Sequence, residues 1–276
     1  MKYVLIGAGP AGVRAAETLR KEDPTGEITL VGGEPGAPYA RMAIPYVLNK
    51  SITESGALQR KADLHYDLQG IRYLNRKALK VHARADGGTV DLDDGSTLDY
   101  DRLLVATGSS PSLPPIPGTD LPGVVTCWTL EDARAIAEKL QPGNRVVMVG
   151  AGFVAGVCMK SLVGTGVKLS VIAGRAGQLL RTMMAPTGSS MMQRWLEARG
   201  VDVITQGRTE RIEPGPRLVM DTRVIEADLI ILATCVKPNL SFLEGTGAQI
   251  DQGVVVDHFM RTTVPHVYAA GDVAQS

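Results

Sequence analysis

The sequence is poor in aromatic residues and in net charge, and both shortages exclude classes of function. Aromatic side chains make up 4% of the 276 residues, so a groove that stacks nucleic-acid bases is not expected. Lysine plus arginine number 29 and aspartate plus glutamate number 29, which leaves no charge to attract nucleic acid or an anionic membrane. No apolar run approaches the roughly 18 residues that a membrane helix needs. We therefore expect neither a nucleic-acid partner nor a membrane span.

Cysteine is also scarce, and its spacing is uninformative about metals. Cys127, Cys158 and Cys235 are too far apart for a CxxC or zinc motif, and the four histidines show no ligand spacing. An odd number of widely spaced thiols fits a reducing compartment. The first three residues run directly into an apolar strand, without the pattern of a secretory leader. We therefore expect a cytoplasmic protein without a metal site.

Glycine, by contrast, is abundant, with 31 residues, and it forms a patterned turn near the start of the chain. An apolar strand over 3–6 leads into a GxGxxG run, an expected helix over 13–21 and a second strand over 27–31. In such a unit the three glycines permit the turn, the approach of backbone to a pyrophosphate, and close helix packing. An acid after the second strand binds ribose hydroxyls. The predicted site comprises Gly7, Gly9, Pro10, Ala11, Gly12 and Glu34.

The same pattern recurs 143 residues later, from Gly7 to Gly150. A strand over 145–149 precedes a GxGxxA run, a helix and a strand over 167–172, and alanine is tolerated at the third position. No acid ends that strand; Arg175 can pair instead with a 2′-phosphate, which favours NADPH over NADH. The alternative is a solvated arginine in a glycine turn. The second predicted site comprises Gly150, Gly152, Phe153, Val154 and Arg175.

Two further motifs complete a resemblance to the FAD-dependent pyridine nucleotide oxidoreductases, flavoproteins with two dinucleotide folds. Residues 100–108 are similar to the family's ATG strand, and residues 267–273 match its GD motif, whose aspartate binds the ribitol of FAD. The resemblance implies an α/β fold of two Rossmann-like domains, the second inserted in the first. It implies an FAD domain of residues 1–112 and 241–276, and an NAD(P) domain of residues 113–240. The FAD residues that it adds are Ala106, Thr107, Gly108, Gly271 and Asp272.

Residues 37–46 resemble the Pro-Tyr-x-Arg stretch of ferredoxin, rubredoxin and nitrite-reductase-type reductases. The resemblance implies that Arg41 reaches the FAD phosphates or ribose as a fixed cationic fork, the alternative being a surface arginine. NADH oxidases and coenzyme A disulfide reductases carry a redox cysteine where this chain has Met42. A thioether cannot form a disulfide. We therefore expect no protein disulfide step and a separate electron acceptor.

The sequence departs from the family at two positions and at its end. Val157 stands where the nicotinamide half usually carries a glutamate, and Tyr46 stands where ferredoxin reductases carry a lysine near flavin N5. We therefore assign no catalytic acid or base. The sequence ends at Ser276, where relatives continue with an interface domain. Part of the flavin's usual cover is accordingly expected to come from elsewhere or to be absent.

These features predict an FAD-dependent NAD(P)H oxidoreductase that passes a hydride from the nicotinamide to the flavin. Its electrons would go to a small electron-carrier protein or another redox subunit, in a homo- or hetero-oligomer. One alternative is an FAD-binding electron-transfer or assembly subunit of a larger redox complex, with a degenerate nicotinamide site. Another is an NADH oxidase whose flavin reacts directly with oxygen. The sequence does not choose the acceptor or the oligomeric state.

Overall fold

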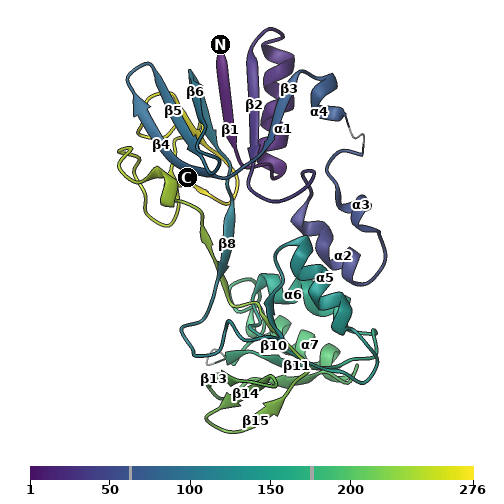
Figure 1. Cartoon of the computed structure of the whole chain (residues 1–276). Helices are drawn as coiled ribbons and strands as arrows, with labels where there is room; N and C mark the ends of the chain where they lie inside the picture. Colours follow the sequence, from purple (N-terminus) through teal and green to yellow (C-terminus); the bar gives the residue numbers. More distant parts are fainter. Residues whose placement is uncertain (62–63, 175–176) are drawn as a thin grey trace. The chain divides into compact units, whose positions relative to one another are not determined.

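The computed structural model describes residues 1–61, 64–174 and 177–276 (Figure 1). The chain forms two compact units. Unit 1 comprises Met1–Ala40, Leu58–Ser110 and Lys237–Ser276, and unit 2 comprises Arg41–Ala57 and Pro111–Val236. Each unit has a five-stranded parallel sheet at its centre with helices packed against it. The predicted α/β class is therefore confirmed.

The sheet of unit 1 has the strand order β19-β7-β1-β2-β3. Its central strand is a short apolar run that is buried at its carboxyl end, as expected of a parallel strand covered on both faces. Parallel pairing places the carboxyl ends of all five strands at one edge of the sheet. The strands are β1 (Lys2–Ile6), β2 (Glu27–Gly32), β3 (Ile71–Asn75), β7 (Arg102–Val105) and β19 (Val267–Ala269).

Helix α1 (Pro10–Glu22) runs alongside β1 and β2 (Figure 1). Val13 and Ala16 are fully buried on its inner face, where they join a core with Leu5 and Leu30. The helix begins three residues before the predicted start because proline fits the first helical position, where no backbone N–H is needed. The short helix α4 (His65–Leu68) packs beside β3.

The rest of unit 1 builds a second core on the opposite side of β1 and β7. A three-stranded antiparallel sheet contributes Val81, Val90 and Leu92 to this core. The segment that precedes β19 adds Phe242 and Leu243 to the same core. The elements are β4 (Ala78–Arg84), β5 (Gly87–Leu92), β6 (Thr97–Tyr100), η3 (Ser241–Leu243), β18 (Val254–Val255) and β20 (Ala274–Gln275).

Unit 2 repeats this plan with the strand order β12-β11-β10-β16-β9. Its strands are β9 (Val124–Thr126), β10 (Arg145–Val149), β11 (Lys168–Ile172), β12 (Asp202–Ile204) and β16 (Leu229–Leu232). An antiparallel sheet comprises β13 (Thr209–Glu213), β14 (Arg217–Met220) and β15 (Val224–Glu226). The helical segments are η1 (Arg41–Ala43), α2 (Ile44–Leu48), α3 (Glu54–Ala57), α5 (Leu130–Lys139), α6 (Phe153–Leu162) and α7 (Pro186–Glu197).

The two sheets correspond strand for strand, with β1 matching β10 and β2 matching β11. Only the outermost strand differs in chain order: β19 follows the other strands of its sheet, whereas β9 precedes them. In each sheet the central strand has a crossover to each side, so the loop that follows it lies at a topological switch point. Open α/β sheets bind ligands outside the carboxyl ends of their strands at that point. Strands β8 (Ser109–Ser112) and β17 (Cys235–Pro238) pair where the chain passes from one unit to the other.

None of the helices in the described ranges has the length and hydropathy needed to cross a bilayer. Within the same ranges no group of three or more His, Cys, Asp or Glu side chains is arranged to hold a metal ion.

Candidate dinucleotide-binding sites

In the first glycine loop, which belongs to unit 1, backbone contacts leave no room for a side chain at two positions, Gly7 and Gly12. Gly7 has a φ of +113°, and its amide donates to the carbonyl of Val31 at 2.8 Å. A Cβ at Gly7 would lie 2.1 Å from the carbonyl oxygen of Ala106, and one at Gly12 would lie 1.9 Å from that of Gly7. Both positions therefore require glycine, for the turn and for helix packing.

Gly9 is different, because a Cβ there would meet nothing within 4 Å. It is the N-cap of α1, and no side chain caps the helix there. The first-turn N–H groups and the positive end of the helix dipole thus face an open position, which favours an anion such as a pyrophosphate. The loop therefore combines N–H donors at a helix start with an open position beside Gly9.

The other residues predicted around this loop follow neighbouring strands at the same edge of the sheet. Ala106, Thr107 and Gly108 come directly after β7, and the amide of Ala106 donates to Ile6 at 2.7 Å. Gly271 follows β19, and a Cβ there would lie 3.2 Å from that of Ala11. The structure thus brings the glycine loop, the ATG segment and the GD motif of unit 1 together.

Two predicted acids also belong to unit 1. Glu34 follows β2 and is half-buried, and its carboxylate accepts a hydrogen bond from the hydroxyl of Tyr39. Asp272 is exposed, and the Ser109 hydroxyl lies 3.5 Å from one of its carboxylate oxygens. Both acids therefore follow strands whose carboxyl ends form the edge that holds the glycine loop.

The second glycine loop has the same geometry in unit 2. Gly150 has a φ of +115°, its amide donates to Ile172 at 3.0 Å, and a Cβ there would lie 2.2 Å from the carbonyl oxygen of Ala233. Gly152 is the N-cap of α6, and a Cβ there would again meet nothing within 4 Å. Phe153 and Val154 form the first turn of that helix. Unit 2 thus repeats the open helix start seen in unit 1.

The other four positions that the sequence singles out are Arg41, Arg175, Tyr46 and Val157. Arg41 belongs to unit 2, where its guanidinium donates to the Trp128 carbonyl at 2.8 Å and lies 5.4 Å from that residue's ring centroid. Arg175 lies outside the described residues. Tyr46 on α2 is exposed, and Val157 on α6 is half-buried.

Sequence reasoning missed two polar side chains that fix the loops of unit 1. Asn239 holds the ATG segment: its side-chain nitrogen donates to the Thr107 carbonyl at 2.9 Å, and its backbone carbonyl accepts from the Thr107 hydroxyl at 3.0 Å. Gln59 donates to the carbonyl of Ala8, inside the first glycine loop, at 3.0 Å. These contacts join residues 132 and 51 positions apart, and no local pattern marks them.

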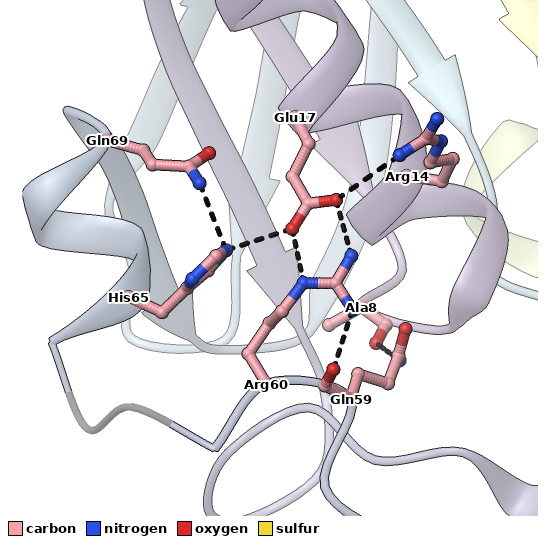
Figure 2. Close-up of polar contacts among 7 residues, drawn as sticks. All are labelled: Ala8, Arg14, Glu17, Gln59, Arg60, His65 and Gln69. Atoms are coloured by element: carbon pink, nitrogen blue, oxygen red, sulfur yellow. Dashed lines mark hydrogen bonds and ion pairs between the residues drawn. The ribbon is translucent and has the colours of Figure 1, made fainter.

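A buried ion pair behind the first loop was also missed (Figure 2). Glu17 lies on the inner side of α1, with 8% of its side chain exposed, and its carboxylate accepts from both Nε and Nη2 of Arg60 and from His65 Nε2 at 2.9 Å. The hydrogen bonds from Arg60 hold the pKa of Glu17 below its usual range, although burial opposes them. Because Arg60 is next to Gln59, the pair anchors the segment that reaches Ala8.

Glu17→Gln is expected to lower the free energy of unfolding by about 2 kcal/mol at neutral pH, because Arg60 loses its carboxylate partner but is one-third exposed and partly hydrated. The pKa of Glu17 is lower in the folded than in the unfolded protein. Its contribution is therefore present above the unfolded value, about 4.3, and is lost as the pH falls through the folded value. Thermal unfolding from neutral pH to about pH 3 should show the difference shrinking below about pH 4.

The matched control is Glu22→Gln, at an exposed position near the end of the same helix. It should change stability by no more than about 0.5 kcal/mol. A gap between wild type and Glu17→Gln that persists unchanged into acid would show that the carboxylate charge is not its cause.

Comparisons with known proteins show the family of this chain. The sequence model of the pyridine nucleotide-disulphide oxidoreductases matches residues 1–276. The chain is 32% identical over 273 residues to the epsilon subunit of the NADH-dependent phenylglyoxylate dehydrogenase of Aromatoleum evansii, covering 98% of this chain and 64% of that sequence. It is 30% identical over 283 residues to the rhodocoxin reductase of Rhodococcus erythropolis, covering 99% and 65% respectively.

Among solved structures, putidaredoxin reductase in its covalent complex with putidaredoxin superimposes with a TM-score of 0.91 at 28% identity, covering 99% of this chain and 67% of that one. The chain thus spans less than two thirds of the length of the two curated relatives. Because the family model matches the whole chain, which carries both glycine loops, this protein belongs to the pyridine nucleotide-disulphide oxidoreductase family.

Proposed function

We propose that this chain is an FAD-dependent NAD(P)H oxidoreductase, with FAD on unit 1, NAD(P)H on unit 2, and electrons delivered to a separate redox protein. The observation that carries the proposal is the pair of equivalent loops at Gly9 and Gly152. Each loop begins a helix at the switch point of its own parallel sheet, with open space where a pyrophosphate approaches. Two such sites in one chain fit a flavin that is reduced by a nicotinamide.

The chain's own residues would bind and orient the two nucleotides. The first-turn amides of α1 would hold the FAD pyrophosphate, with Glu34 accepting from ribose hydroxyls and Asp272 accepting from the ribitol. Asn239 and Gln59 would keep the surrounding backbone in place. FAD, when bound, supplies the hydride and electron chemistry. Rate enhancement would come from positioning rather than from a side-chain acid or base.

Arg41 remains a proposed FAD contact, through its charged guanidinium. The guanidinium carries a permanent charge and can bind phosphate oxygens bidentately.

The acceptor is proposed to be a small electron carrier or a redox subunit. Met42 offers no thiol at the position where relatives with a redox cysteine carry it, so the chain has no internal acceptor there. The names of two relatives support an external acceptor: rhodocoxin reductase, and an electron transfer subunit of an assimilatory nitrate reductase in Bacillus subtilis.

The choice of nucleotide rests on opposing observations. Ala173 at the end of β11 brings no carboxylate to a ribose 2′-hydroxyl, and with Arg175 it favours NADPH. Relatives named for NADH, such as the phenylglyoxylate dehydrogenase subunit and an NADH oxidase of Methanocaldococcus jannaschii, favour NADH. A preference for NADPH and a preference for NADH predict different titration results.

The deciding experiment is an anaerobic titration of FAD-loaded protein with NADPH and then with NADH. We expect stoichiometric bleaching of the flavin band near about 450 nm by at least one of them. The nucleotide that bleaches at the lower concentration is the preferred donor. Bleaching by dithionite but by neither nucleotide would exclude the reductase activity for this chain.

That second result would favour a specific alternative, an FAD-binding subunit whose nicotinamide site no longer works. Val157 supports it, because the acid that usually follows the second glycine loop is missing. The relative that is itself one subunit of a dehydrogenase supports it as well. Such a subunit would relay electrons between partners or serve in assembly.

A further inference from the structure

The three cysteines, far apart in sequence, gather in unit 2 at the edge of the sheet that carries the second glycine loop. Cys127 directly follows β9, Cys235 begins β17 three residues after β16, and Cys158 lies in the middle of α6. Cys127 and Cys158 are buried, with 5% and 3% of their surfaces exposed, whereas Cys235 is exposed. The sulfur atoms of Cys127 and Cys158 lie 3.1 Å apart.

The position of Cys127 is fixed by its neighbours on both sides. The Asp132 carboxylate accepts hydrogen bonds from the Thr126 hydroxyl at 2.7 Å, the Trp128 amide at 2.8 Å and the Thr129 amide at 3.0 Å. These contacts also cap α5, so the turn is part of the scaffold. Cys158 is equally constrained by its place inside a helix. The close approach of the two sulfurs is therefore built into the fold.

The hydrogen bond between the two sulfurs makes them unequal as acids. It lowers the pKa of Cys158, although burial opposes this. The same hydrogen bond, with burial, raises the pKa of Cys127. Thiolates rather than thiols attack peroxides and disulfides. A nucleophile and a second sulfur to resolve it thus lie in direct contact.

Access to the two buried sulfurs is restricted by the small volume of the cavity beside Cys127. Cys127 and Cys235 line the same small cavity, together with Val154 of the second loop and with Trp128, Leu232 and Ala233. Its volume is about 10 Å³, close to the least that accommodates one water. Cys158 does not line this cavity, so the route to the pair passes Cys127. Hydrogen peroxide has two heavy atoms and needs only a small local opening there, whereas a disulfide such as oxidised glutathione is far larger and is expected to react only at the exposed Cys235.

We propose that Cys127 and Cys158 form an oxidation site at which hydrogen peroxide produces an internal disulfide beside the second glycine loop. The thiolate attacks one peroxide oxygen; an S–O bond forms, the O–O bond breaks, and the departing hydroxide is protonated to water. The other sulfur then attacks the sulfenic sulfur, so that the S–S bond forms and the S–O bond breaks. A second water leaves with the remaining thiol proton. The two cysteines lose two electrons, and peroxide accepts them.

The test treats the full-length protein with hydrogen peroxide or, separately, with oxidised glutathione, and then alkylates the free thiols after denaturation. Arg134, Lys139 and Arg145 lie between the two cysteines, so trypsin places them in separate peptides and mass spectrometry detects a link directly. With peroxide we expect alkylatable thiols to fall from three to one, with a linked peptide pair that dithiothreitol separates. With oxidised glutathione we expect a mixed disulfide on Cys235 and no link.

Single substitutions separate the proposed pair from the exposed thiol. Cys235→Ser should retain the peroxide-induced link, whereas Cys127→Ser and Cys158→Ser should both abolish it. In Cys127→Ser the remaining Cys158 should stop at a sulfenic acid that dimedone traps. The proposal is overturned if peroxide oxidises Cys235 while Cys127 and Cys158 remain alkylatable. It is also overturned if the link involves Cys235. Because this readout needs neither nicotinamide nor turnover, it is independent of the proposed reductase activity.

Discussion

Gly9→Ala is expected to weaken FAD binding at least about tenfold while leaving the fold intact. Gly9 has φ −72° and ψ 179°, a conformation open to any residue, and its Cβ would meet no protein atom within 4 Å. The cost to stability should stay below about 1 kcal/mol, the usual scale for an N-cap exchange. The new methyl group would instead occupy the position through which a pyrophosphate approaches the helix. Fluorescence titration of apoprotein with FAD measures the loss, and thermal unfolding checks the fold.

Gly152→Ala is the matched variant in unit 2, because the two glycines cap equivalent helices in nearly the same conformation. It should leave FAD affinity unchanged and raise the nicotinamide concentration needed for flavin reduction by a similar factor. If Gly152→Ala loses FAD while Gly9→Ala keeps it, the cofactors are assigned to the wrong units. If neither variant changes any binding, the loops do not hold pyrophosphates.

The parts of this molecule that sequence could predict are those with a local cause. Each glycine loop can be recognised in the sequence because the turn, the cap and the helix contact all fall within six residues of a buried apolar strand. The α/β class follows from two such units in one chain. The start of α1 was misplaced by three residues, because the N-cap role of Gly9 depends on how the turn folds rather than on the helical periodicity that marked residue 13.

The parts that sequence could not predict depend on contacts across long separations. Asn239 lies 132 residues from its partner Thr107, and Arg60 lies 43 residues from Glu17. A polar residue in a loop carries no sign of which distant backbone it will contact. Cys127 and Cys158 are a similar case: their spacing matches no motif, and only the tertiary fold brings their sulfurs to 3.1 Å from each other. The Arg41–Trp128 contact likewise arises because residues 41–57 pack within unit 2.

The third position of the two glycine runs predicts a large asymmetry in stability. A Cβ at Gly12 would lie 1.9 Å from the carbonyl oxygen of Gly7, and backbone on both sides leaves no flexible atom to move. Gly12→Ala should therefore lower the free energy of unfolding by at least about 3 kcal/mol, the upper range for overpacking, and should abolish FAD binding with it. Thermal unfolding followed by circular dichroism, with the FAD retained on purification, measures both effects.

The control is the reverse exchange at the equivalent position, Ala155→Gly. The second unit already carries a methyl group there, fully buried at 0% exposure, so α6 lies far enough from its loop to admit one. Removing it costs about 1 kcal/mol through helix propensity and a little more through the lost buried methyl. Gly12→Ala should consequently unfold at a markedly lower temperature than Ala155→Gly. Equal midpoints for the two variants would mean that α1 can shift away from Gly7, and that the first loop is less rigid than its backbone contacts require.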